Sequence, residues 1–167
     1  MQAVPRVGIV MGSDSDLNVM EAALGIFKKF GIPIEMTVAS AHRSPQRATA
    51  YAVSARQRGL KAIIAGAGHA AHLAGVLAAH TTLPVIGVPI DSSCLQGLDA
   101  LLSTVQMPPG IPVATVSIGK PGAKNAAILA VQIMAASDDA LSAQLENFKK
   151  EMAAQVEKKA EKLREYR

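Results

Sequence analysis

The chain has 167 residues and a formal net charge of +4 at pH 7, and half of its residues are hydrophobic although only 3% are aromatic. This length predicts one domain, residues 1–167, with an aliphatic core of the kind that parallel sheets bury. The scarcity of aromatic side chains argues against a nucleic-acid partner, and the longest uncharged stretch, residues 62–90, is interrupted by Gly, His and Pro, so we expect no membrane span.

The single cysteine, Cys94, excludes an internal disulfide and a metal site built from several thiolates. A reducing, cytoplasmic location is therefore expected. Because no base or second cysteine accompanies Cys94 in the sequence, an unreactive thiol is favoured over a nucleophile.

Short β-branched apolar runs alternate with stretches of helical periodicity, which predicts a parallel sheet. The expected strands are residues 6–11, 34–39, 61–66, 84–89 and 113–118. The expected helices are residues 16–30, 45–58, 70–79, 95–103, 123–136 and 138–167. Right-handed crossovers between these strands predict an α/β fold: a three-layer flavodoxin-like sandwich with a five-stranded parallel sheet and an extended C-terminal helix.

The C-terminal helix carries many of the basic residues, but they are interleaved with glutamates at a spacing of three, as in Lys158 and Glu161. This pattern is typical of a solvated or subunit-packing helix. It fits a polyanion-binding tail less well.

Ligands of such sheets bind outside the carboxyl ends of the strands. The sequence places its chemistry-bearing loops there: GSDSD (12–16), SAHR (40–43), GAGHAAH (66–72), PIDSSCLQG (89–97) and GKPGAKN (119–125). The opposite ends of the strands carry turns.

The GSDSD loop opens a helix, so its hydroxyls and free N–H groups suit a bound anion, and Asp16 suits the hydroxyls of a ribose. Helix capping by Ser and Asp explains the same residues equally well, and the two roles are compatible.

In SAHR, Arg43 offers a permanently charged fork for phosphate, and His42 offers the side chain that most readily exchanges protons near neutral pH. A surface ion pair for Arg43 and a purely structural His42 are the alternatives. The neighbouring anion site favours the functional interpretation.

The third loop has only glycine and alanine at positions 66–68 and 70–71. These small residues predict a small apolar pocket walled by backbone. His69 and His72 are three residues apart, but no nearby Cys, Asp or Glu completes a set of metal ligands, so no metal is expected. His72 is expected to orient a substrate or to pack at a subunit contact. His80 is expected to be structural.

Together these motifs resemble the PurE family over residues 6–136, through GSDSD, SAHR, GAGHAAHLAG (66–75), GLDALLSTVQMPPGIPVATVSIG (97–119) and GAKNAAILA (122–130). The resemblance implies a homo-octamer whose C-terminal helix, about 138–167, packs on neighbouring subunits. SAHR and GAG with AAHL resemble class I, the 5-(carboxyamino)imidazole ribonucleotide mutases, more than class II, the aminoimidazole ribonucleotide carboxylases. Two positions depart from the usual class I pattern: His69 stands in place of Gly, and Ala74 in place of Pro.

The resemblance implies a carboxylate transfer from the exocyclic nitrogen to ring carbon four of a ribonucleotide, with CO2 as intermediate, without cofactor, and with His42 as general acid and base. It implies that the substrate is bound by Ser13, Ser15, Asp16, Ser40, Arg43, Gly68, Ala70, His72 and Leu73.

Three other functions compete with the mutase interpretation. Direct carboxylation of aminoimidazole ribonucleotide by CO2 needs the same groups, so the loops alone separate it from the mutase. A receiver-like phosphoacceptor would need an aspartate after the third strand, where the sequence has none. A flavin-binding module would need aromatic residues in the loops at this rim, and they contain none.

Overall fold

The computed structural model describes residues 4–166, the side chain of Glu165 excepted. The chain divides into two compact units, one up to Val131 and one from Gln132 onward. The strands are β1 (Val7–Met11), β2 (Ile34–Val38), β3 (Ala62–Gly68), β4 (Val85–Ile90) and β5 (Ala114–Thr115). The helices are α1 (Leu17–Met20), α2 (Leu24–Lys29), α3 (Pro45–Ala55), α4 (Leu73–Ala79), α5 (Leu98–Val105), α6 (Gly119–Ala135) and α7 (Asp139–Leu163), with 3-10 turns at Asp14–Asp16, Glu21–Ala23 and Arg164–Tyr166.

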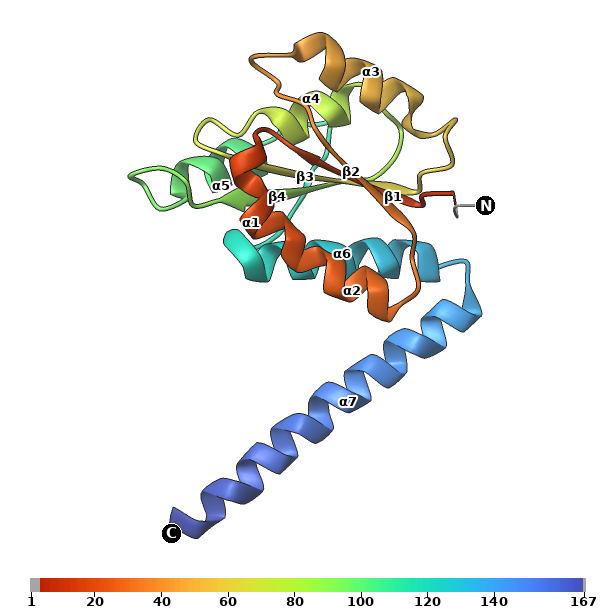
Figure 1. Cartoon of the computed structure of the whole chain (residues 1–167), viewed down its shortest axis with the longest axis vertical. Coiled ribbons are helices and arrows are strands. Elements are labelled where there is room, and N and C mark those ends of the chain that lie inside the picture. The colour runs from red at the N-terminus through yellow and green to blue at the C-terminus, as the bar shows by residue number, and fades with distance from the viewer. Residues whose placement is uncertain (1–3, 167) are drawn as a thin grey trace. The chain divides into compact units, whose positions relative to one another are not determined.

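The first unit contains a five-stranded sheet in the order β2-β1-β3-β4-β5, in which every pair of neighbours is parallel. Helices α3 and α4 lie on one face of this sheet, and α1, α2 and α6 lie on the other (Figure 1). The predicted flavodoxin-like α/β sandwich is confirmed: all five strands are parallel, and the order in which the chain adds strands to the sheet reverses between β1 and β3.

The core is aliphatic, as the composition predicts. Every residue of β1 and of β4 is buried, and so are the first five residues of β3, whereas the edge strand β2 is only partly covered. Burial on both faces explains why the inner strands are continuous apolar runs without polar alternation.

Several predicted element boundaries are wrong. The predicted helix 16–30 is interrupted by the 3-10 turn Glu21–Ala23, and the predicted strand 113–118 shrinks to the two residues of β5. After β5 the carbonyl of Ser117 lies against Gly122, where any Cβ would overlap it. The predicted helix 123–136 begins at Gly119 instead, since Pro121 falls in the first turn, where proline is tolerated.

The second unit consists mainly of α7. Its N-terminus is capped by Asp138, whose carboxylate accepts a hydrogen bond of 3.0 Å from the N–H of Leu141. The helix runs for 25 residues, in agreement with the predicted C-terminal helix. Among the residues that the structure describes, no helix combines the length and the apolar character needed to cross a lipid bilayer.

Candidate active site

The register of the sheet brings three of the predicted loops together. Met11, the last residue of β1, pairs with Val38 of β2 on one side and with Gly66 of β3 on the other. The segments that follow these strands therefore start side by side at the carboxyl edge of the sheet.

A cavity of about 540 Å³ lies at this edge. All ten residues that the sequence singles out as site residues line it: Ser13, Ser15, Asp16, Ser40, His42, Arg43, Gly68, Ala70, His72 and Leu73. The lining is completed by Gly12, Ala41, Ala67, His69 and Ser92.

The GSDSD loop forms a capping box. Oγ of Ser13 accepts the N–H of Ser15 at 3.4 Å, and Oδ2 of Asp16 accepts the N–H of Ser13 at 3.0 Å. Burial raises the pKa of Asp16, and the opposing effects of the N–H groups of Ser13 and Gly12 and of the charge on Arg43 are smaller. The capping role expected for this loop is thus observed, on residues that also line the cavity.

Two hydrogen bonds from backbone N–H groups to serine hydroxyls hold the SAHR loop. The N–H of Ser40 donates to Oγ of Ser44 at 2.9 Å, and the N–H of Arg43 donates to Oγ of Ser40 at 3.1 Å. Within residues 4–166 the guanidinium group of Arg43 has no ion pair, so its charge remains available to an anion in the cavity.

His42 and His72 contact each other directly across the cavity wall. Nε2 of His42 lies 2.7 Å from Nδ1 of His72, and the two rings meet edge to face with centroids 4.8 Å apart. At this distance one nitrogen must carry a hydrogen and the other must not, so each ring fixes the tautomer of the other. Sequence reasoning placed both residues in the site but did not predict this hydrogen bond.

In the third loop, the backbone of Gly66 and of Gly68 lies so close to neighbouring side chains that no Cβ would fit. A Cβ on Gly66 would lie 2.5 Å from Sδ of Met20, and one on Gly68 would overlap the hydroxyl of Ser92. Sequence reasoning missed Ser92, although the loop after β4 ends at the same edge of the sheet. That location was the available signal.

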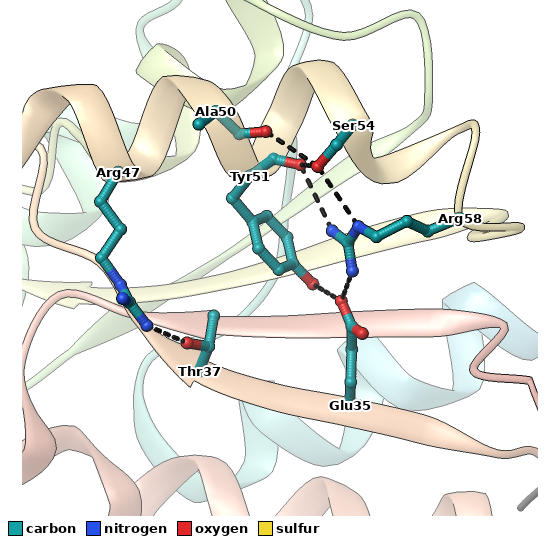
Figure 2. Close-up of polar contacts among 7 residues, drawn as sticks. All are labelled: Glu35, Thr37, Arg47, Ala50, Tyr51, Ser54 and Arg58. Carbon is teal, nitrogen blue, oxygen red and sulfur yellow. Dashed lines mark hydrogen bonds and ion pairs between the residues drawn. The ribbon is translucent and has the colours of Figure 1, made fainter.

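A second set of contacts joins β2 and α3, the two elements that flank the SAHR loop (Figure 2). Glu35 of β2 accepts a hydrogen bond of 2.7 Å from the Tyr51 hydroxyl and pairs with Arg58. Nearer the loop, Nε of Arg47 donates to the carbonyl of Val38 at 2.7 Å. These contacts fasten α3 to β2 along its length, so the loop between them is anchored at both ends.

Other candidates lie away from the cavity. Cys94 is exposed and does not line it, His80 ends α4, and Lys120 donates to Asn18 at 2.9 Å. Over residues 4–166 the structure contains no cluster of three or more His, Cys, Asp or Glu side chains suited to a metal ion.

The chain is similar to proteins of one family throughout. The model of the family described as "AIR carboxylase" matches residues 6–155. The "N5-carboxyaminoimidazole ribonucleotide mutase" of Pyrococcus horikoshii is 56% identical over 96% of this chain and 90% of its own length. The "Phosphoribosylaminoimidazole carboxylase" of Saccharomyces cerevisiae is also 56% identical, over 95% of this chain, but the chain spans only 28% of that protein.

The structural comparison agrees with the sequence comparison. The crystal structure of Treponema denticola PurE superposes with a TM-score of 0.84 at 28% identity and covers 95% of this chain and 98% of that one. The fold, the matched length and the sequence identity therefore converge: the chain belongs to the AIR carboxylase family, to which its resemblance to PurE pointed.

Proposed function

We propose that this chain is an N5-carboxyaminoimidazole ribonucleotide mutase of purine biosynthesis, converting 5-(carboxyamino)imidazole ribonucleotide into 4-carboxy-5-aminoimidazole ribonucleotide. The observation that carries the proposal is the meeting of His42 with Ser13, Asp16 and Arg43 around one cavity. An acid–base group there adjoins groups suited to a phosphorylated ribose. The mutase name of the Pyrococcus horikoshii relative, 90% of which the chain covers, supports it further.

The ribonucleotide is held by the first two loops. Arg43 and the hydroxyls of Ser13, Ser15 and Ser40 bind the phosphate, because a guanidinium group and hydroxyl donors together suit its oxygens. Asp16 accepts the ribose hydroxyls. A second hollow of about 310 Å³ beside the cavity is lined by Ser13, Ser40 and Arg43 as well, and supports a phosphate position there.

The reaction has two steps, a decarboxylation and a carboxylation, and His42 transfers a proton in both. The imidazolium of His42 gives a proton to the exocyclic nitrogen, the bond between this nitrogen and the carboxyl carbon breaks, and CO2 is released. Ring carbon four then bonds to the CO2 carbon, and the neutral His42 removes the proton from carbon four. The proton returns to the residue that supplied it, so the net reaction is an isomerisation.

His72 supports this exchange as the hydrogen-bond partner of His42. The 2.7 Å contact holds the His42 ring at the cavity and couples the tautomer of His42 to that of His72. In the complex the exocyclic nitrogen of the ribonucleotide also comes within hydrogen-bond distance of the His42 ring, because proton transfer requires that contact.

Gly68, Ala70 and Leu73 form the part of the cavity that retains CO2. Their small or apolar side chains leave room for a three-atom molecule and offer it no strong hydrogen bond, so retention relies on confinement. The same groups would serve direct carboxylation of aminoimidazole ribonucleotide. The carboxylase name belongs, however, to a yeast protein of which this chain spans 28%, whereas the Pyrococcus horikoshii mutase is covered almost entirely.

The active form we propose is a cytoplasmic homo-octamer in which α7 packs on neighbouring subunits. Support comes from the apolar side chains of α7 that remain exposed, namely Met152, Val156 and Leu163.

The deciding experiment is His42→Asn, assayed with the carbamate ribonucleotide. Turnover should fall by at least about 100-fold, because the variant cannot exchange the proton. The dissociation constant of the ribonucleotide, measured by calorimetry, should stay within about threefold, because a neutral side chain of similar size remains in the cavity.

His80→Asn is the matched control, since His80 is an exposed histidine outside the cavity. It should behave as the unmodified protein. Substantial turnover in His42→Asn would remove His42 from the acid–base role. Activity on aminoimidazole ribonucleotide plus bicarbonate, with none on the carbamate, would replace the mutase by the carboxylase.

A further inference from the structure

His69 adopts an unusual backbone conformation at the edge of the cavity. Its φ is +54°, and within residues 4–166 the only other non-glycine residue with positive φ is Gln96, at +52°. This left-handed region disfavours any residue with a Cβ, although histidine enters it more often than most. A strained residue at a ligand cavity calls for a function that its side chain performs.

The side chain of His69 is held against the neighbouring loop. Nδ1 lies 3.2 Å from Oγ of Ser92, and both residues line the cavity. This contact is possible because Gly68 has no side chain, since a Cβ there would overlap the Ser92 hydroxyl. Gly68, His69 and Ser92 thus form one local arrangement that joins the loop after β3 to the loop after β4.

The arrangement leaves one ring nitrogen of a cavity-lining histidine free to donate a hydrogen bond. When the Ser92 hydroxyl donates to Nδ1, the neutral ring must carry its hydrogen on Nε2. Nε2 has no hydrogen-bond partner among the described residues, and the side chain is exposed.

We propose that His69 is a further substrate-contacting residue, which donates Nε2–H to the migrating carboxylate and to the CO2 derived from it, and which covers the cavity beside Gly68 and Ala70. This inference rests on the proposed mutase function. Without His69, more of the carbamate follows a side path: its nitrogen takes up a proton, its N–C bond breaks, and CO2 leaves for solvent, so that aminoimidazole ribonucleotide is released instead of the 4-carboxy product.

The test is a partition measurement with a carbamate carrying ¹³C in the migrating carboxyl group. For His69→Gly the ratio of label lost as CO2 to label retained at carbon four should rise roughly tenfold over the unmodified enzyme, after subtraction of the loss in enzyme-free buffer. Ser92→Ala, which frees the ring without removing it, should give a smaller rise. His80→Ala should give none.

The melting temperature separates this role from a structural one. Glycine tolerates φ of +54°, so His69→Gly should melt at the same temperature as the unmodified enzyme or higher. If it melts lower, His69→Asn decides, since asparagine tolerates the same backbone but is too short to reach the ligand.

An unchanged partition ratio in His69→Gly, or in His69→Asn where the glycine variant melts lower, would overturn the proposal. Failure of the mutase function itself would look different, because the unmodified enzyme would then place no label on carbon four.

Discussion

The carboxylate of Asp16 has two roles. It closes the capping box of the first loop and lines the cavity, yet it is only 5% exposed. Burial raises its pKa, so the charged form is held at a cost in stability that the N–H groups of Ser13 and Gly12 and the charge on Arg43 reduce but do not remove. The fold therefore keeps, at the proposed ribose position, a charge that capping alone does not require.

Asp16→Asn tests this division of roles. The folded pKa lies above the unfolded one, so the native state binds the proton more tightly, and the carboxylate lowers stability as pH rises from about 4 toward neutrality. The variant, which has no such charge, should match or exceed the unmodified protein in free energy of unfolding at pH 7 and should lack this part of the pH dependence. Urea unfolding at several pH values measures both.

The same variant should bind the ribonucleotide about tenfold more weakly in calorimetry, because the amide loses a charged acceptor for ribose hydroxyls. Asp139→Asn is the control, since Asp139 is exposed and does not line the cavity. Unchanged affinity in Asp16→Asn would leave Asp16 as a capping residue alone.

At this scale the sequence predicts well which residues line the cavity, but it predicts their geometry poorly. The ten residues named from loops after the first three strands all line the cavity, because strand ends in a parallel sheet share one edge. The hydrogen bond between His42 and His72 joins residues 30 positions apart, and the φ of His69 depends on the packing of two loops. Neither feature can be recognised from the local sequence.

Among the elements, α3 and β2 carry the loop that presents His42 and Arg43. Figure 2 shows Tyr51 and Arg58 converging on Glu35, while Arg47 contacts Thr37 near the other end of the strand. The guanidinium of Arg58 also lies 4.6 Å from the centre of the Tyr51 ring. A helix tied in this way cannot shift along the strand without breaking several contacts together, which keeps the loop in place.

Tyr51→Phe measures the strength of this attachment. At pH 7 the free energy of unfolding should fall by about 1 kcal/mol, the contribution of one hydrogen bond to a carboxylate that retains Arg58. Burial, and then the carboxylate of Glu35, raise the pKa of Tyr51. The phenol therefore adds stability that is complete below about pH 10, where the unfolded tyrosine ionises, and is lost as pH rises further.

The phenylalanine variant should lack that alkaline loss in denaturant titrations between pH 8 and pH 11. Tyr166→Phe, at the only other tyrosine, is the control because Tyr166 is 87% exposed. An identical alkaline slope in Tyr51→Phe would show that Glu35 does not hold the phenol proton.

Element types follow from sequence more reliably than element lengths. The apolar runs that become β1, β3 and β4 are continuous because both faces of the sheet are covered, and this pattern is local. The two-residue length of β5 and the 3-10 turn after α1 interrupt otherwise continuous patterns, so neither could be read from periodicity.

At the scale of the whole molecule, apolar surface remains exposed in both units. Leu98, Leu102 and Val105 follow one face of α5, and Met152, Val156 and Leu163 follow one face of α7. Surfaces of this kind mark protein contacts, and in a closed assembly the same face meets copies of the chain.

Replacing Met152, Val156 and Leu163 together by glutamine should dissociate the proposed octamer, because each apolar side chain removed from an interface forfeits about 1.5 to 3 kcal/mol. Light scattering after size exclusion measures the mass, and circular dichroism checks that the helix persists. Replacing Lys158 and Lys162 by glutamine on the same helix is the control and should leave the mass unchanged. A triple variant of undiminished mass would exclude α7 from the interface.

The two margins of the sheet have a consequence for solubility at high concentration. An unprotected outer strand can recruit a strand from another molecule and start aggregation. Here β5 offers only two residues for such pairing. On the outer strand β2, the carbonyl of Val38 already accepts a hydrogen bond from the charged side chain of Arg47 in α3. The protein can therefore hold an open cavity at one end of its strands while both edges of the sheet discourage the strand exchange that leads to fibrils.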